Sequence, residues 1–155
     1  MLPIKPFRQR PGYCGPACLK MVLEYYGIKK TEREVARLAG TTARWGTPAT
    51  GLVKAVKSFG LKGKVKDNAD LSDVRKYISK KIPVIVNWFS TDEGHYSVVV
   101  GIDEKFIYLQ DPELASVRKL DLVTFKRVWF DFHGDFIKQK SDIVLRRLVV
   151  VLPQA

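Results

Sequence analysis

The sequence predicts an α+β fold in which an N-terminal helical half packs on an antiparallel β-sheet. Helix start and stop signals fill the chain up to Pro83, and from there the apolar residues follow the patterns of strands. Helices that precede strands in this way are typical of α+β domains. With 155 residues and 46% apolar content, the chain is long enough for one core, so residues 1–155 are predicted to form a single domain.

The first predicted helix is the stretch around which the other predictions are arranged. Pro16 suits a first helical turn, and Gly27 suits the stop after the last turn. Cys14 therefore lies where a loop becomes a helix, and the free N–H groups and macrodipole at that end favour an anionic thiolate. The apolar face of the helix repeats at i, i+3, i+4 and i+7 through Leu19, Val22, Leu23 and Tyr26.

Three further helices are predicted from their caps. Thr31 and Glu34 form a capping box for a short helix that stops at Gly40. After a loop over 41–46, Thr47-Pro48 is expected to cap a third helix, which ends at Gly60. Asp70 is expected to cap a fourth helix.

The strand predictions begin with an exposed edge strand, because its lysines alternate with other residues over 62–66. The nearly continuous apolar run 83–89 is typical of a central strand. A short helix is expected over 121–129, and the aromatic piece that follows it to Phe136 fits neither pattern. The other predicted strands cover 96–102, 106–110, 117–120 and 143–152.

Composition indicates a cytoplasmic protein with reduced thiols. No apolar run approaches the roughly 18 residues needed to span a membrane, and the N-terminus lacks the apolar core of a signal peptide. Two cysteines four residues apart on one helix do not form a disulfide framework.

The formal charge of +11 raises the alternative of a nucleic-acid binder. The lysines and arginines are scattered along the chain and accompany no groove-reading motif, so specific nucleic-acid binding is not expected. A basic nucleic-acid binder would lose affinity steeply as salt is raised.

Three residues have the chemistry of an activated nucleophile: Cys14 as the thiol, His95 as the base and Asp111 as the group that orients the base. If the turn after 96–102 leaves Ile102 opposite Phe106, Asp111 is the diagonal neighbour of His95 on the same face. A register shifted by one residue would send Asp111 to the other face. Gly94, before His95, is expected to leave that histidine open to solvent.

Four short pieces in this order resemble the papain-like double-glycine (bacteriocin leader) peptidase family: Gln9, Cys14-Gly15-Pro16-Ala17, Gly94-His95-Tyr96 and Asp111-Pro112. The resemblance covers nearly the whole chain. It implies that Cys14 is the nucleophile, His95 the general base and acid, and Asp111 the residue that orients His95. It also implies that Gln9 joins the backbone N–H of Cys14 in an oxyanion hole. Tyr13 departs from the acidic or polar residue that usually precedes the cysteine in transporter-linked members, and the chain has no transporter or ATPase segment.

Other chemistry-bearing residues are expected to be structural. Cys18 is interpreted as a small buried hydrophobe and His133 as structural. No metal or cofactor is predicted, since Cys14, Cys18, His95 and His133 lack the spacing of a zinc site. The larger aromatic residues are expected in the core rather than in a substrate groove: Trp45, Trp88, Trp129, Phe130 and Phe132.

The sequence therefore predicts a cysteine peptidase that hydrolyses a peptide bond through a thioester, with leader-peptide processing as a candidate role. An acyl or peptidyl transferase would use the same residues, and a non-catalytic peptide-binding module would use the same scaffold. The expected partners are a peptide or protein substrate and a separate transporter, with no specific nucleic acid and no membrane span.

Overall fold

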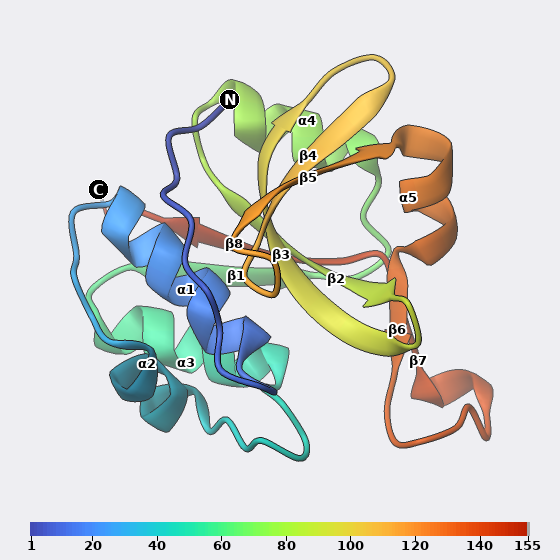
Figure 1. Ribbon diagram of the computed structural model, residues 1–155, viewed down its shortest axis with the longest axis horizontal. Helices are drawn as coiled ribbons and strands as arrows, with labels where there is room; N and C mark the ends of the chain where they lie inside the picture. Colours follow the sequence, from blue (N-terminus) through green and yellow to red (C-terminus); the bar gives the residue numbers. More distant parts are fainter. Residues whose placement is uncertain (155) are drawn as a thin grey trace.

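The computed structural model describes residues 1–154 and confirms the predicted α+β class. A six-stranded sheet has the order β1-β8-β2-β3-β4-β5, with every neighbouring pair antiparallel (Figure 1). The helices are α1 (Cys14–Tyr25), α2 (Glu32–Ala39), α3 (Ala49–Ser58), α4 (Leu71–Ser79) and α5 (Leu122–Val128). The strands are β1 (Lys62–Lys66), β2 (Val84–Ser90), β3 (Glu93–Ile102), β4 (Phe106–Asp111), β5 (Ser116–Asp121), β6 (Phe130–Phe132), β7 (Ile143–Leu145) and β8 (Arg147–Leu152).

Two apolar clusters form the core, one on each face of the sheet. Helices α1, α2 and α3 bury one face, and α4 and α5 cover the other. Successive residues of β2 point into different clusters, since Ile85 belongs to the first and Val84 and Val86 to the second. This two-sided burial explains why the β2 sequence is continuously apolar.

The helix signals in the sequence are mostly confirmed. Helix α1 begins at Cys14, α2 has the predicted capping box of Thr31 and Glu34, and Asp70 caps α4. Strand β1 lies at an edge of the sheet, as its lysine alternation predicts. Of the predicted cap Thr47-Pro48, Pro48 occupies the N-cap of α3 without a side-chain hydrogen bond. The Thr47 hydroxyl does not cap the helix and is hydrogen-bonded to the Thr41 hydroxyl at 2.7 Å.

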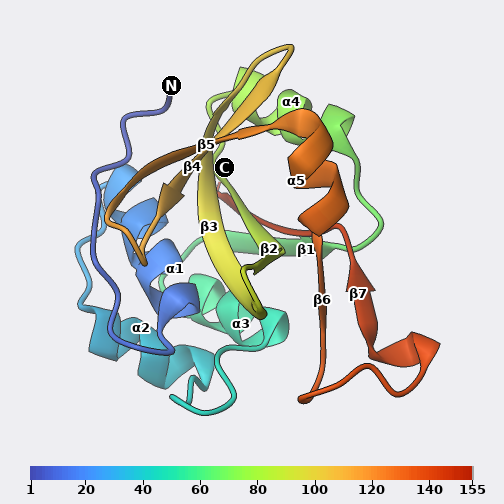
Figure 2. The ribbon, with the colours of Figure 1, turned by 45° about the vertical axis from the view of Figure 1, so that its right-hand side comes forward.

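The predicted final strand, 143–152, is divided in two. At Arg146 the backbone has φ 45°, and its N–H donates to the Trp129 carbonyl oxygen. This turn sends β7 to pair with β6, while β8 enters the main sheet between β1 and β2. The aromatic piece before Phe136, for which no element was predicted, therefore contains β6. The β6–β7 pair forms a separate two-stranded sheet beside the main sheet (Figure 2).

The β3–β4 pairing corrects the predicted turn but confirms the register at the site. Ile102 pairs with Ile107 rather than with Phe106. A bulge between Val99 and Gly101 then shifts the register by one residue, so that Val98 faces Gln110, the pairing that the prediction required. The carbonyl of the bulge residue, Val100, accepts a hydrogen bond from the Leu2 N–H, so the N-terminal segment stabilises the bulge.

The aromatic residues differ in burial. Trp88 and Trp129 are buried as predicted, and Phe130 and Phe132 are partly buried and stack on Phe89. Trp45 is 67% exposed, so its assignment to the core is wrong. It lies in the loop before α3, where Arg44 covers one side of its ring.

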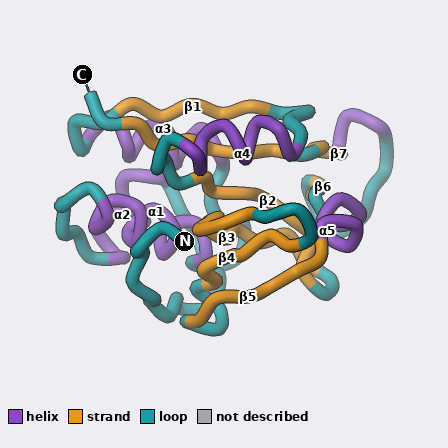
Figure 3. Tube along the Cα trace, turned by 90° about the horizontal axis from the view of Figure 1, so that it is seen from above, coloured by secondary structure: helices purple, strands orange, loops and turns teal. Residues whose placement is uncertain are grey.

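The structure also places α5 and the β6–β7 pair at the end of the sheet opposite α2 (Figure 3). None of the helices within residues 1–154 is long and apolar enough to cross a membrane.

Candidate active site

Cys14 is the first residue of α1 and is half-buried. The N-cap residue, Tyr13, makes no side-chain cap, and the first turn carries no acidic residue. The backbone N–H groups around Cys14 therefore have no side-chain cap, which leaves this helix end suited to a negative charge.

A close contact fixes this helix end. A Cβ on Gly15 would lie 2.8 Å from side-chain atoms of Thr47, so only glycine allows the two segments to approach so closely. The Thr47 carbonyl in turn accepts a hydrogen bond from the Tyr96 hydroxyl at 2.9 Å. Because Tyr96 follows His95, these contacts connect the start of α1 to the strand that carries the histidine.

His95 and Asp111 are joined by a short, buried hydrogen bond. His95 Nε2 lies 2.6 Å from Asp111 Oδ1, and the two residues are 3% and 0% exposed. The expectation that Gly94 opens His95 to solvent is wrong: Gly94 is exposed, but the His95 ring is buried beside Trp88 and Asp111. The Asp131 carboxylate lies against Gly94. Asn87 connects the two segments by donating to the Asp131 carboxylate and to the His95 carbonyl.

The Asp111 carboxylate accepts two further hydrogen bonds. The backbone N–H of Glu113 donates to Oδ1, and Arg118 Nη1 donates to Oδ2, both at 3.0 Å. Arg118 was missed by the sequence analysis. The signal that could have identified it is the β4–β5 register: Arg118 pairs with Leu109 and is thus the diagonal neighbour of Asp111.

The histidine and its neighbours have shifted pKa values. Burial alone would lower the pKa of His95, but the hydrogen bond to Asp111 and the nearby Cys14 thiol raise it to about 10. Burial alone would raise the pKa of Asp111, but the hydrogen bond and charge of His95 lower it. The imidazole thus bonds Asp111 through Nε2 and leaves Nδ1 as the nitrogen that can exchange a proton with the Cys14 thiol.

The second cysteine has a different environment. Cys18 is fully buried, and burial, followed by the charge of Cys14, raises its pKa. This confirms the interpretation of Cys18 as a small buried hydrophobe. His133 is exposed after β6 and takes no part in the site.

Gln9 lies beside the end of β4, where its backbone N–H donates to the Pro112 carbonyl at 2.9 Å. Its side-chain Nε2 donates to the Arg10 carbonyl at 3.3 Å, and its Oε1 is buried without a hydrogen-bond partner. Gln9 thus bonds Pro112, the residue that directly follows Asp111. The hydrogen-bonding capacity of its side-chain amide is only partly used.

One cluster of possible metal ligands occurs among residues 1–154, formed by His95, Asp111 and Glu113. His95 Nε2 and Asp111 Oδ1 already bond each other, and Asp111 Oδ2 bonds the Arg118 cation. The chemistry of this cluster favours an acid–base pair over a cation site.

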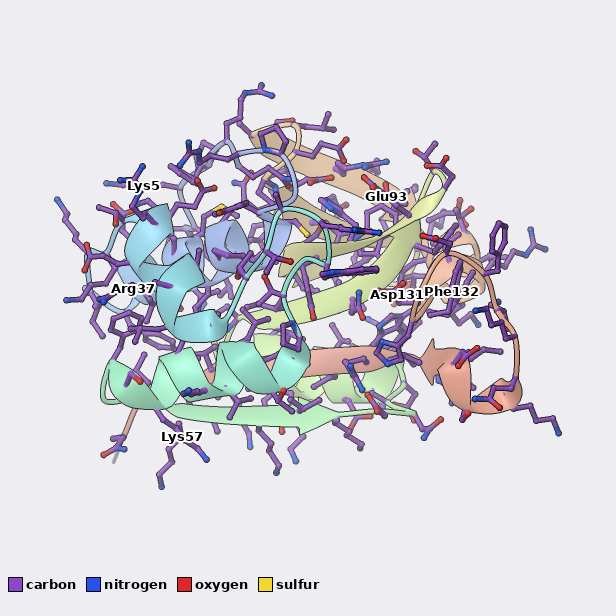
Figure 4. The ribbon with its side chains drawn as sticks, turned by 90° about the horizontal axis from the view of Figure 1, so that it is seen from below. Lys5, Arg37, Lys57, Glu93, Asp131 and Phe132 are labelled. Atoms are coloured by element: carbon purple, nitrogen blue, oxygen red, sulfur yellow. The ribbon has the colours of Figure 1, made fainter. Side chains whose placement is uncertain are left out.

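Strand β6 contacts β2 and β3, the strand that carries His95. Figure 4 shows Glu93, Asp131 and Phe132 on the same side of the molecule. Both oxygens of Asp131 accept hydrogen bonds, from Asn87 Nδ2 and from the backbone N–H of Phe132. Asp131 therefore attaches β6 to the strand end that carries His95.

Comparison with known proteins gives a consistent picture. The model of a family described as the peptidase C39 family matches residues 7–133. The chain is 40% identical over 105 residues to an uncharacterized protein of Methanothermobacter thermautotrophicus, covering 67% of this chain and 68% of that protein. It is 35% identical over 118 residues to the pediocin PA-1 transport/processing ATP-binding protein PedD of Pediococcus acidilactici, but spans only 16% of that relative's length.

Solved structures of other proteins share the fold. The peptidase domain of Streptococcus ComA superposes with a TM-score of 0.77 at 24% identity, covering 97% of this chain and 99% of that domain. A double glycine motif protease from an AMS/PCAT transporter, solved in complex with the leader peptide, superposes with a TM-score of 0.72 at 23% identity. It covers 97% of this chain and 91% of that protease. These neighbours confirm the papain-like α+β class.

The raised pKa of His95 predicts how stability depends on pH. A histidine whose folded-state pKa is raised contributes stability that is complete below its unfolded pKa, roughly 6.5, and is lost as pH rises toward about 10. Because Asp111 supplies part of this shift, the free energy of unfolding should fall less between pH 6.5 and 9 in Asp111→Asn than in the wild type. Urea titrations at the two pH values measure the free energy of unfolding of each protein. An equal decrease with pH in both proteins would show that Asp111 does not raise the pKa of His95.

Proposed function

Because the chain belongs to the peptidase C39 family of cysteine peptidases, we propose that it hydrolyses a peptide bond with Cys14, His95 and Asp111 as its catalytic groups. The observation that supports this proposal best is the arrangement around His95. One ring nitrogen bonds the buried Asp111 carboxylate, and the imidazole also interacts with the Cys14 thiol. This is the arrangement that nucleophilic catalysis by a thiol requires.

The proposed reaction has two stages. Cys14 Sγ attacks the carbonyl carbon of the scissile bond, and the thiol proton is held on His95. When the tetrahedral intermediate collapses, the C–N bond breaks, His95 gives its proton to the leaving amine, and a thioester remains on Cys14. Water then attacks the thioester and transfers a proton to His95. Collapse of the second intermediate breaks the C–S bond, releases the new carboxyl group and returns the proton to Cys14.

Asp111 serves this cycle in two ways in our proposal. Its hydrogen bond to Nε2 prevents the imidazole from rotating and leaves Nδ1 toward Cys14. Its negative charge also stabilises the imidazolium present whenever His95 holds the proton. The raised pKa of His95 is consistent with the second role.

Gln9 is proposed to stabilise the oxyanion together with the backbone N–H of Cys14. Preorganised donors of this kind stabilise negative charge only as it develops, so they lower the barrier rather than strengthen substrate binding. The buried, unpartnered Oε1 supports a functional role, because an unsatisfied polar atom is destabilising and packing gives no reason to retain it. In this role the Gln9 amide turns from Arg10 so that Nε2 donates to the oxyanion.

As substrate we propose a precursor peptide with a leader that ends in a double-glycine motif. The similarity to PedD, named as a transport/processing protein, and to the double glycine motif protease supports this substrate class. We further propose that a transporter receives the processed peptide, because the relative PedD is named as a transport/processing protein. The need for a free thiol agrees with a cytoplasmic location.

The transferase alternative uses the same thioester but passes the acyl group to an amine rather than to water. The peptide-binding alternative needs no functional thiol. Incubation with a synthetic double-glycine peptide separates the three, since hydrolysis gives a free carboxyl product, transfer gives a new amide in the presence of added amine, and binding alone gives no product.

We expect the wild type to cleave such a peptide after the second glycine and Cys14→Ala to give no detectable product by mass spectrometry. Cys18→Ala is the matched control, because Cys18 is fully buried on the same helix and has no assigned chemistry. Cys18→Ala should retain activity at a temperature where it is folded. Cleavage by Cys14→Ala, or equal loss in both variants, would remove Cys14 from the reaction.

The Gln9 role predicts a loss of turnover without a loss of nucleophile reactivity. Gln9→Ala should lower kcat by roughly 10²–10³-fold, the usual effect of removing one oxyanion donor. Alkylation of Cys14 by iodoacetamide should continue at the wild-type rate, because the thiol does not depend on that amide. A variant that unfolds, or that keeps full turnover, would assign Gln9 to structure alone.

The Asp111 role predicts an order of activities. Asp111→Asn keeps an acceptor of the same shape beside His95 Nε2, so it should keep substantial activity, at or below the wild type. Asp111→Ala removes both the acceptor and the charge, so the imidazole can rotate and activity should fall well below that of Asp111→Asn. Initial rates on one peptide, with circular dichroism as a control for folding, measure this order. Wild-type activity in Asp111→Ala would show that Asp111 does not orient His95.

A further inference from the structure

The buried carboxylate of Asp111 has a neighbour that the proposed reaction does not yet use. Asp111 Oδ1 bonds His95 Nε2 and the Glu113 N–H, so both contacts with the catalytic side converge on one oxygen. The other oxygen, Oδ2, accepts a hydrogen bond from Arg118 Nη1 at 3.0 Å. A carboxylate can rotate about its terminal torsion, and hydrogen bonds on both oxygens are needed to fix its plane.

Arg118 is itself held in place. Its Nη1 also lies 3.3 Å from Ser90 Oγ, and its guanidinium lies over the ring of Trp88 at 5.0 Å from the centroid. The Trp88 indole N–H donates to Ser97 Oγ at 3.0 Å, which fixes the ring. The guanidinium is therefore positioned by an aromatic face on β2 and cannot follow Asp111 freely if that side chain moves.

The same tryptophan also contacts the histidine. The rings of Trp88 and His95 meet edge to face with centroids 5.9 Å apart. Trp88 thus packs against both the base and the cation that bonds the orienting carboxylate. Arg118, Asp111 and His95 form a continuous chain of hydrogen bonds, with Trp88 packed beside it.

We infer that Arg118 is a positioning residue of the proposed reaction: its guanidinium fixes the plane of the Asp111 carboxylate so that Oδ1 remains on His95 Nε2. This inference rests on the proposed function, in which Asp111 orients His95. A second consequence follows from charge. Asp111 is 0% exposed, and a buried anion without a cation beside it is unfavourable, so Arg118 also maintains Asp111 as the carboxylate that His95 requires.

To position Asp111, residue 118 must supply N–H donors in a fixed planar arrangement as well as a positive charge. A lysine at position 118 would keep the charge, but its single ammonium group cannot lie flat on Trp88 and bond Oδ2 and Ser90 in the same geometry. Arg118→Lys should therefore keep part of the activity, and Arg118→Met, which has a similar stem and no donor, should keep least. Lys119→Met is the matched control, because Lys119 is the exposed next residue of β5 and lies over Phe106 instead.

Kinetics on a double-glycine peptide give the first test. Arg118→Met should lower kcat by roughly 10- to 100-fold, the range seen when a group that orients a functional ligand is lost, while KM changes by less than about threefold. Arg118→Lys should fall between Arg118→Met and the wild type, and Lys119→Met should match the wild type. In Arg118→Ala, guanidinium chloride at millimolar concentration should restore activity, because the Arg118 side chain is 28% exposed and its removal opens a path to Oδ2. Sodium chloride at the same ionic strength should not.

Proton NMR gives a readout that needs no substrate. The chain has two histidines, and a His133→Gln background leaves His95 as the only imidazole. The Nε2–H proton, in a 2.6 Å bond to Asp111, should give a sharp downfield signal in the wild type and in Lys119→Met, and should exchange with water and disappear in Arg118→Met.

The outcomes separate this inference from the proposed function. If Arg118→Met keeps both the downfield signal and the wild-type kcat, Arg118 does not position Asp111, and the inference is overturned even though the peptidase stands. If no protein cleaves the peptide but the signal still depends on Arg118, the proposed function fails while the positioning role holds. Thermal unfolding identifies a misfolded Arg118→Met, and in that case Arg118→Lys and guanidinium rescue of Arg118→Ala decide the question.

Discussion

The hydrogen bond between His95 and Asp111 is the interaction on which the site depends, because it joins two strands at the one place where their side chains must meet. Both partners are buried, and neither has an alternative partner in water. A buried polar pair is stabilising only when its geometry is good, so the β3–β4 register cannot shift without leaving a buried charge unpaired. The bulge at Val100, bonded to Leu2, absorbs the extra residue between the turn and the site and so preserves this register.

Contacts at Gly15 and Thr47 connect the start of α1, which carries the thiol, to the strand that carries His95. Gly15 permits the start of α1 to approach Thr47, and Thr47 is hydrogen-bonded to Tyr96 on the histidine strand. The N-terminal segment adds a third connection, since Gln110 Nε2 donates to the Ile4 carbonyl and Gln9 bonds Pro112. The residues proposed for catalysis thus come from three distant parts of the sequence. Contacts outside the reactive groups add to the His95–Asp111 hydrogen bond in holding these parts together.

The sequence predicted those features that local chemistry determines. Capping residues identified the starts of α2 and α4, the helix start placed Cys14 correctly, and alternation identified β1 as an edge. Features that depend on distant segments were not predictable in this way. The break at Arg146 involves the carbonyl of Trp129, and the His95 ring is buried beside Trp88 and Asp111 from neighbouring strands.

The same distinction applies within the site. Cys14, His95 and Asp111 could be chosen from their chemistry and order along the chain, but Arg118 could be found only once the β4–β5 register was known.

The most direct test of the account is the rate at which iodoacetamide modifies the two cysteines at pH 6, followed by intact mass and peptide mapping. The account predicts that Cys14 reacts much faster than a free cysteine at this pH, because it lies at the uncapped start of α1 with His95 as its proposed base. Cys18, which is fully buried, should stay unmodified. His95→Ala should remove the advantage of Cys14. If Cys14 reacted no faster than free cysteine, or at the same rate with and without His95, the thiol and the imidazole would not act as a pair and the proposed mechanism would be contradicted.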